Sequence, residues 1–124
     1  MKKIEHIGIA VKNLEEANTL YESLLGLSNY KTEQVESEGV RTSFFRVGDS
    51  KIELLEATNN QSPIAKFIAK RGEGIHHIAF KVDDIKAEIN RLEKEGFTVI
   101  NKEPKPGADN KLVAFLHPKN TCGV

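Results

Sequence analysis

The sequence predicts an α+β domain built from two βαβββ modules, which together form a curved sheet around a metal site. An apolar strand pattern followed by a capped amphipathic helix occurs twice, over residues 3–25 and 76–96. At an offset of 71 residues, "HIGIAV" from His6 falls on "HIAFKV" from His77. No linker or low-complexity segment divides the 124 residues. The modules, about 1–60 and 72–124, are therefore expected to form a single domain spanning 1–124.

The first strand and helix have clear boundaries. "KIEHIGIAV", residues 3–11, alternates as a strand does. Asn13 is a good N-cap, and Glu16 stands three residues later, as in a capping box. The apolar stripe of this helix consists of Leu14, Ala17, Leu20, Tyr21, Leu24 and Leu25. Gly26 is expected near its end.

A hairpin and a short helix follow. "RTSFFRV" (41–47) and "KIELLEA" (51–57) are expected strands, joined by the turn residues Gly48 and Asp49. Ser62 and Pro63 open a short helix, "PIAKFIAK", that stops before Gly72.

The second half repeats this order. "HHIAFKV" (76–82) is an expected strand, Asp84 caps a helix, and "IKAEINRLEKEG" (85–96) is amphipathic. "FTVI" (97–100) and "LVAFLH" (112–117) are expected strands around a loop containing Pro and Gly. The final strand of this module would begin at "GV", where the sequence stops, so the module is expected to lack its last strand.

The repeat separates the adjacent histidines, because neighbouring strand residues point to opposite faces of a sheet. His6 matches His77, and small residues such as Gly8 and Ala79 share their faces and leave room for a ligand. The opposite faces, carrying Ile7, Ile9 and Val11 or Ile78, Phe80 and Val82, are expected to pack under helices.

Three residues are predicted metal ligands: His6, His77 and Glu53. Two histidines on equivalent strands can converge on one ion. Glu53 lies in an apolar strand, where a carboxylate is costly to bury without a cation. Glu56 competes with it but points to the opposite face. By the repeat, a fourth ligand belongs on the final strand, which is not in this sequence.

The other two histidines are interpreted differently. His76 shares the face of Ile78 and Phe80 and is expected to be structural, with support of a neighbouring ligand as the alternative. His117 precedes Pro118 and is expected to be a turn or cavity-wall residue.

Composition favours a cytoplasmic small-molecule protein. The 18 basic and 18 acidic residues balance, which argues against binding nucleic acid or a membrane surface through bulk charge. The single Cys122 cannot form an internal disulfide, and no segment resembles a signal peptide or a membrane span.

Several segments carry a family resemblance. The paired modules with strand-borne His, Glu and His resemble the vicinal oxygen chelate superfamily, which includes glyoxalase I and extradiol dioxygenases. Within it, the methylmalonyl-CoA epimerase family has similar segments in the same order. They are "HIGIAVKNLEEA", "VGDSKIELLEA", "SPIAKFIAKRGEGIHHIAFKVDDI", "EPKPGA" and "VAFLHPKNTCGV". The stretch from Ser62 to Ile85 is the most specific.

The resemblance implies a divalent metal held by His6, Glu53 and His77, a coenzyme A thioester substrate and a homodimer. Mixed nitrogen and oxygen ligands do not choose among Co, Mn, Ni, Zn and Mg. Some family members carry a Glu, proposed as a base, at the position of Thr42. A threonine is no general base at neutral pH, so the catalytic bases are left unassigned.

We expect Thr42, Lys70 and Arg71 to contact substrate. Basic side chains could meet the coenzyme A phosphates, with Lys66, Lys102 and Lys105 as further candidates.

The expected activity is epimerisation of methylmalonyl-CoA, in which a metal helps to remove the α-proton through an enolate. The alternatives are isomerisation of a glutathione hemithioacetal, as in glyoxalase I, and a non-catalytic binding or resistance protein on the same scaffold. A ferrous dioxygenase is less favoured because such enzymes commonly need a longer chain.

Overall fold

The computed structural model describes residues 1–124, which form two compact units: residues 4–80, and residues 1–3 with 81–124. The strands are β1 (Lys3–Ala10), β2 (Lys31–Val35), β3 (Val40–Val47), β4 (Ser50–Ala57), β5 (Gly74–Lys81), β6 (Lys105–Pro106) and β7 (Leu112–Val113). The helices are α1 (Leu14–Leu25), α2 (Pro63–Arg71) and α3 (Ile85–Lys94), with short 3-10 turns at Glu36–Glu38, Ala108–Asn110 and Pro118–Asn120. None of the helices has the length and apolar character needed to cross a membrane.

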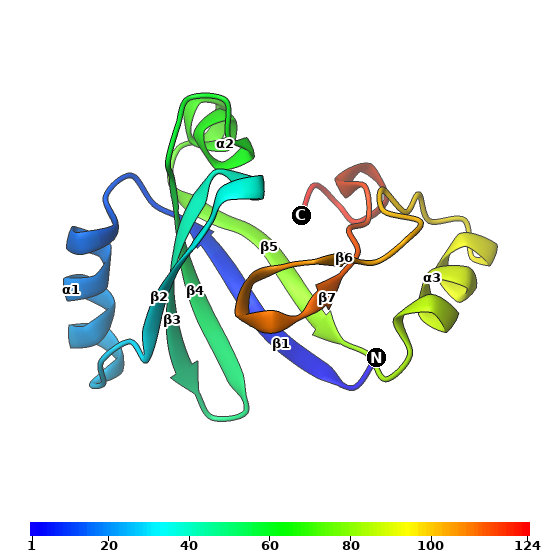
Figure 1. The fold of residues 1–124 in the computed structure, drawn as a ribbon, viewed down its shortest axis with the longest axis horizontal. Coiled ribbons are helices and arrows are strands. Elements are labelled where there is room, and N and C mark those ends of the chain that lie inside the picture. Colours follow the sequence, from blue (N-terminus) through cyan, green and yellow to red (C-terminus); the bar gives the residue numbers. More distant parts are fainter. The chain divides into compact units, whose positions relative to one another are not determined.

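A five-stranded sheet in the order β2-β3-β4-β1-β5 forms the framework of residues 4–80 (Figure 1). β2, β3 and β4 are antiparallel neighbours, whereas β1 pairs with β4 in parallel. Both pairings of β4 meet at Glu53, which is opposite Gly8 on β1 and Phe44 on β3. The sheet thus brings β1 beside a strand more than 40 residues later in the chain.

Helices α1 and α2 cover opposite faces of this sheet (Figure 1). The α1 face buries Val11, Leu14, Phe45 and Leu54, and the α2 face buries Ala10, Val40, Leu55 and Ile64. Consecutive residues such as Leu54 and Leu55 enter different clusters, as strand alternation requires. We call the side bearing Leu55 and Ala10 the α2 face.

The caps of the first two helices are confirmed. The side chain of Asn13 accepts the amide of Glu16 at 3.0 Å, and Gly26 ends α1 with a left-handed φ of 70°. Ser62 accepts the amide of Ala65 at 3.2 Å at the start of α2. These local signals fix where the chain leaves and re-enters the sheet.

The expected strands of the C-terminal segment are largely wrong. Residues 97–100 and 112–117 meet only at one bridge, between Val99 and Leu116, while β7 pairs with β6 inside the expected loop. The backbone N–H of Thr98 donates a hydrogen bond to the side-chain oxygen of Asn120, and that of Phe115 donates to the side-chain oxygen of Asn101. Asparagine side-chain oxygens therefore accept from two backbone N–H groups that would pair with backbone carbonyls in a regular strand ladder.

This segment still packs as its apolar pattern predicts. Ile89 and Leu92 of α3 form a buried cluster with Val99, and partly buried side chains surround it: Ile85, Phe97, Ala114 and Leu116. The N-cap is Asp84, which accepts the amide of Ala87 at 3.1 Å.

Two further differences concern the strands. β2 was not located from sequence, because among its five residues only Val35 is apolar. β5 also begins at Gly74, two residues before the expected strand. Apolar alternation identifies β5 as a strand but does not locate its first residue.

Candidate metal centre

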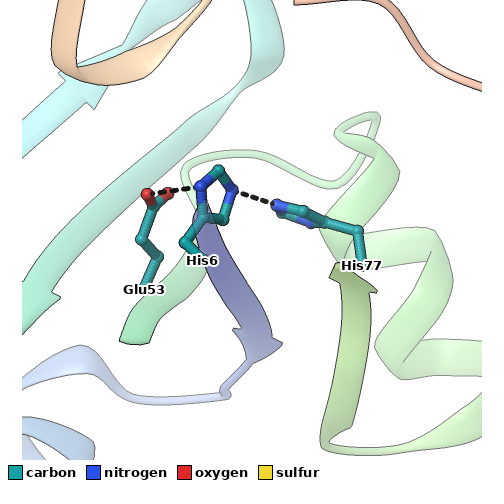
Figure 2. Close-up of side chains that lie close together, drawn as sticks. All are labelled: His6, Glu53 and His77. Atoms are coloured by element: carbon teal, nitrogen blue, oxygen red, sulfur yellow. Dashed lines mark hydrogen bonds and ion pairs between the residues drawn. The ribbon is translucent and has the colours of Figure 1, made fainter. Parts of the chain in front are cut away.

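Three strands of the sheet supply the predicted ligands. His6 comes from β1, Glu53 from β4 and His77 from β5, and one potential donor atom from each lies within 4.8 Å of the others. Figure 2 shows the three side chains converging from their separate strands. The structure therefore brings together the residues that the repeat pairs and the buried carboxylate.

The imidazole of His6 lies between the other two residues (Figure 2). Its Nε2 is 2.9 Å from Nε2 of His77, and its Nδ1 is 3.1 Å from Oε2 of Glu53. The two rings meet edge to face, with centroids 5.0 Å apart. Two imidazole nitrogens and a carboxylate oxygen are ligands that suit several divalent transition metals.

Burial prepares His77 for metal binding. Desolvation lowers the pKa of His77 to about 3, and the neighbouring His6 and His76 contribute in the same direction. At neutral pH the ring is therefore uncharged, which is the form that coordinates a metal. Glu53 is only 4% exposed, where a carboxylate requires a cation or hydrogen-bond donors.

Gly8 makes the space for the His77 ring. A Cβ atom at Gly8 would lie 2.3 Å from Cε1 and 2.6 Å from Nδ1 of His77, far inside van der Waals contact. The sequence indicated small residues beside the histidines, and the structure shows that the missing side chain of Gly8 leaves space for the His77 ring. A glycine inside a strand often marks such a close approach.

Glu5 is a site residue that the sequence analysis missed. Its Oε1 lies 2.9 Å from Nδ1 of His6 and 3.2 Å from Nζ of Lys51, which is 4% exposed. Burial raises the pKa of Glu5, but hydrogen bonds from His6 and Lys51 outweigh it, and the pKa is lowered overall. A lysine within an apolar strand was the available signal that a carboxylate lies nearby.

His76 contacts the centre without belonging to the three-residue cluster. Its Nδ1 lies 3.0 Å from Nδ1 of His77, and its ring meets Phe67 of α2 edge to face at 5.0 Å. Burial lowers the pKa of His76. The structure thus gives it both a packing contact and a contact with a predicted ligand.

Two residues set apart from the site by the sequence analysis have other partners. His117 accepts the amide of Lys119 through Nδ1 at 3.1 Å, as expected of a turn residue. Glu56 accepts the amide of Leu14 at 2.9 Å, on the α1 side of the sheet.

The predicted substrate contacts lie on two elements. Thr42 is 1% exposed on β3, opposite Leu55, so it belongs to the α2 face that also carries Glu53. Its hydroxyl is buried without a hydrogen-bond partner. Lys70 and Arg71 are exposed at the end of α2, and the guanidinium of Arg71 lies 5.7 Å from the centre of the Phe67 ring.

The fold and the sequence agree with one protein family. Residues 5–115 match the model of the Glyoxalase/Bleomycin resistance protein/Dioxygenase superfamily, and the chain belongs to this family. The α+β fold class and the resemblance to vicinal oxygen chelate proteins are confirmed.

Within this superfamily, the chain is similar to methylmalonyl-CoA epimerases along its length. It is 41% identical over 123 residues to the ethylmalonyl-CoA/methylmalonyl-CoA epimerase of Cereibacter sphaeroides, covering 98% of this chain and 92% of that protein. The human mitochondrial methylmalonyl-CoA epimerase is 38% identical over 123 residues, covering 98% and 70%.

A solved structure extends the likeness to three dimensions. A methylmalonyl-CoA epimerase variant from Streptomyces coelicolor, in complex with 2-nitronate-propionyl-CoA, superimposes with a TM-score of 0.96 at 36% identity. The match covers 100% of this chain and 90% of that one.

Proposed function

We propose that this protein interconverts the R and S epimers of methylmalonyl-CoA. The observation that carries the proposal is the convergence of His6, Glu53 and His77 in a chain that matches methylmalonyl-CoA epimerases over its length. A solved relative of the same fold binds a coenzyme A thioester analogue, which supports the substrate class.

The reaction requires a proton to leave carbon 2 and return to its opposite face. The electron pair of the broken C–H bond enters an enolate that extends over the thioester carbonyl. Reprotonation on the other face restores the same atoms and bonds with inverted configuration. The barrier is the charge of the enolate and the low acidity of the C–H bond.

His6, Glu53 and His77 would hold a divalent cation, and their donor set suits it: two imidazoles and one buried carboxylate. Such a cation supplies charge stabilisation for the enolate without adding a proton. We propose Co, Mn, Ni, Zn or Mg for this position, because the donor set does not select among them.

The remaining assignments concern the chain's own side chains. His77 is held neutral by burial and therefore presents a lone pair. Thr42 lacks the basicity to take a proton, and we propose that its buried, unpartnered hydroxyl contacts substrate. Lys70 and Arg71 are proposed to meet the phosphates of coenzyme A, because both are exposed cations at the end of α2.

The test is exchange of the α-proton of methylmalonyl-CoA for deuterium in heavy water. We expect the purified, metal-loaded protein to catalyse exchange and to lose this activity when a chelator removes the metal. His77→Ala should abolish exchange, whereas the surface variant Asp83→Asn should retain it. Turnover of a glutathione hemithioacetal without any exchange would contradict the proposal and favour a glyoxalase I-type activity.

The homodimer and the cytoplasmic location also stay predictions. Light scattering of the purified protein measures its mass, and fractionation of the source cells locates it.

A further inference from the structure

We propose that Glu5, held by Lys51, is a positioning residue that orients the His6 ring and keeps its proton on Nδ1. The inference rests on the metal site of the proposed function and assigns a role to a residue outside the three-ligand cluster. Its basis is one carboxylate oxygen that contacts both the ring nitrogen and a buried ammonium group.

The hydrogen-bond pattern favours one tautomer of the neutral His6 ring, which is the form that binds a metal. Nδ1 lies near two carboxylates, 2.9 Å from Oε1 of Glu5 and 3.1 Å from Oε2 of Glu53. An ionised carboxylate can only accept, so Nδ1 carries the proton of the neutral ring. The lone pair is then on Nε2, which is the nitrogen that faces Nε2 of His77 at 2.9 Å.

Two carboxylates thus share one N–H group, but only one of them belongs to the ligand cluster. A Glu53 carboxylate engaged by a cation would be a weaker acceptor for the Nδ1 proton, and Glu5 would remain to hold that proton in place. A carboxylate that receives the second N–H of a ligating histidine fixes its orientation and strengthens it as a ligand.

Lys51 explains why Glu5 stays in position. Its ammonium group lies 3.2 Å from Oε1 of Glu5, in a residue that is only 4% exposed. Removing one partner of a buried ion pair is strongly destabilising, whereas replacing both by apolar residues is often tolerated. This asymmetry allows the positioning role to be separated from a purely structural one.

A structural role and a positioning role of Glu5 predict opposite orders of damage for two variants. Glu5→Gln retains an oxygen that can accept from His6 but loses the charge opposite Lys51. The double variant Glu5→Leu/Lys51→Met removes both charges of this ion pair and leaves His6 without the Glu5 acceptor. A structural role makes Glu5→Gln the more damaging change, and a positioning role makes the double variant more damaging.

The first readout is Zn²⁺ affinity, measured on the metal-free protein by competition with a chelating dye. We expect the double variant to bind Zn²⁺ about 10- to 100-fold more weakly, since this is the usual effect of losing such a partner. Glu5→Gln should lose less. The control is Asp83→Asn, which removes a carboxylate paired with Lys2 at the surface and should leave affinity unchanged.

The second readout is the Nδ1 proton of His6 in the Zn²⁺-loaded protein, observed by nitrogen-15 NMR. It should exchange slowly with solvent in the wild type and in Glu5→Gln, and rapidly in the double variant. Circular dichroism establishes that the variants are folded.

A folded double variant with unchanged affinity and a slowly exchanging Nδ1 proton would overturn the inference. So would a wild-type protein that binds no Zn²⁺, Co²⁺ or Mn²⁺. A wild type that binds Zn²⁺ with the expected order of affinities, but lacks epimerase activity, would overturn the proposed function and leave this inference standing.

Discussion

Gly8 shows how strongly one residue constrains the centre. We predict that Gly8→Ala displaces the His77 ring and weakens metal binding by at least tenfold, because the added methyl group would overlap that ring. Metal titration of the two proteins measures the effect.

The matched control is the same substitution in a His77→Ala background. Without the ring, the three atoms that the added methyl group would overlap are gone, so the second substitution should change stability less than it does with the ring present. A Gly8→Ala protein with wild-type metal affinity would contradict the prediction. It would show that the strands move apart and that the close approach of Gly8 to His77 is not needed for metal binding.

Thr42 offers a test of the proposed substrate contact. Its hydroxyl is buried without a partner, and such a group costs on the order of 1–3 kcal/mol. Thr42→Val keeps the shape and removes the hydroxyl, so we predict a protein about 1 kcal/mol more stable with a raised KM. Urea unfolding and steady-state kinetics measure the two changes. Increased stability with an unchanged KM would contradict the substrate contact.

The sequence predicted the convergence of His6, Glu53 and His77 better than it predicted their surroundings. His6 and His77 were paired by the repeat, and Glu53 was identified as a carboxylate in an apolar strand. Glu5 was missed because alternation assigns it to the face opposite His6, whereas a long, flexible side chain near the start of a strand reaches its neighbour. Alternation predicts where a Cβ atom points and does not predict the position of a terminal carboxylate.

At the scale of elements, capped helices were predictable and the C-terminal strands were not. Asn13, Ser62 and Asp84 cap their helices through local contacts that a sequence pattern records. Residues 97–100 and 112–117 have apolar residues that pack around α3, and this pattern looks the same whether or not a regular ladder forms. Asn101 and Asn120, which are distant in sequence from the amides that they bind, replace part of the backbone ladder.

One of these asparagines can be tested. We predict that Asn120→Ala lowers the free energy of unfolding by about 1 kcal/mol, because the amide of Thr98 loses its acceptor at 2.8 Å. Hydrogen exchange should also accelerate for residues 97–100. Asn90→Ala, an exposed change on α3, is a suitable control. Unchanged exchange in Asn120→Ala would mean that this hydrogen bond does not hold the segment.

At the scale of the molecule, metal binding should stabilise the fold, because the predicted ligands come from three strands. We predict a higher Tm with added Zn²⁺, corresponding to about 2.7 kcal/mol when free metal is one hundred times the Kd. Differential scanning fluorimetry with and without chelator measures it.

Histidine variants provide the comparison. His6→Ala and His77→Ala should lose the Tm increase, whereas His76→Ala should keep part of it, because His76 lies outside the three-residue cluster. Equal losses from His76→Ala and His77→Ala would show that the assignment of ligands from the repeat is wrong.

The strand order has a consequence for the newly synthesised chain. β1 emerges first, but its sheet neighbours are β4 and β5, which follow more than 40 and 60 residues later. At about 5–20 residues per second, β1 waits several seconds for both partners. During this interval Ile7 and Ile9 are exposed on an unpaired strand, which is a condition that favours aggregation. His6 meets His77 only after the ribosome has produced β5, so binding of a metal by all three residues would report that the sheet is complete.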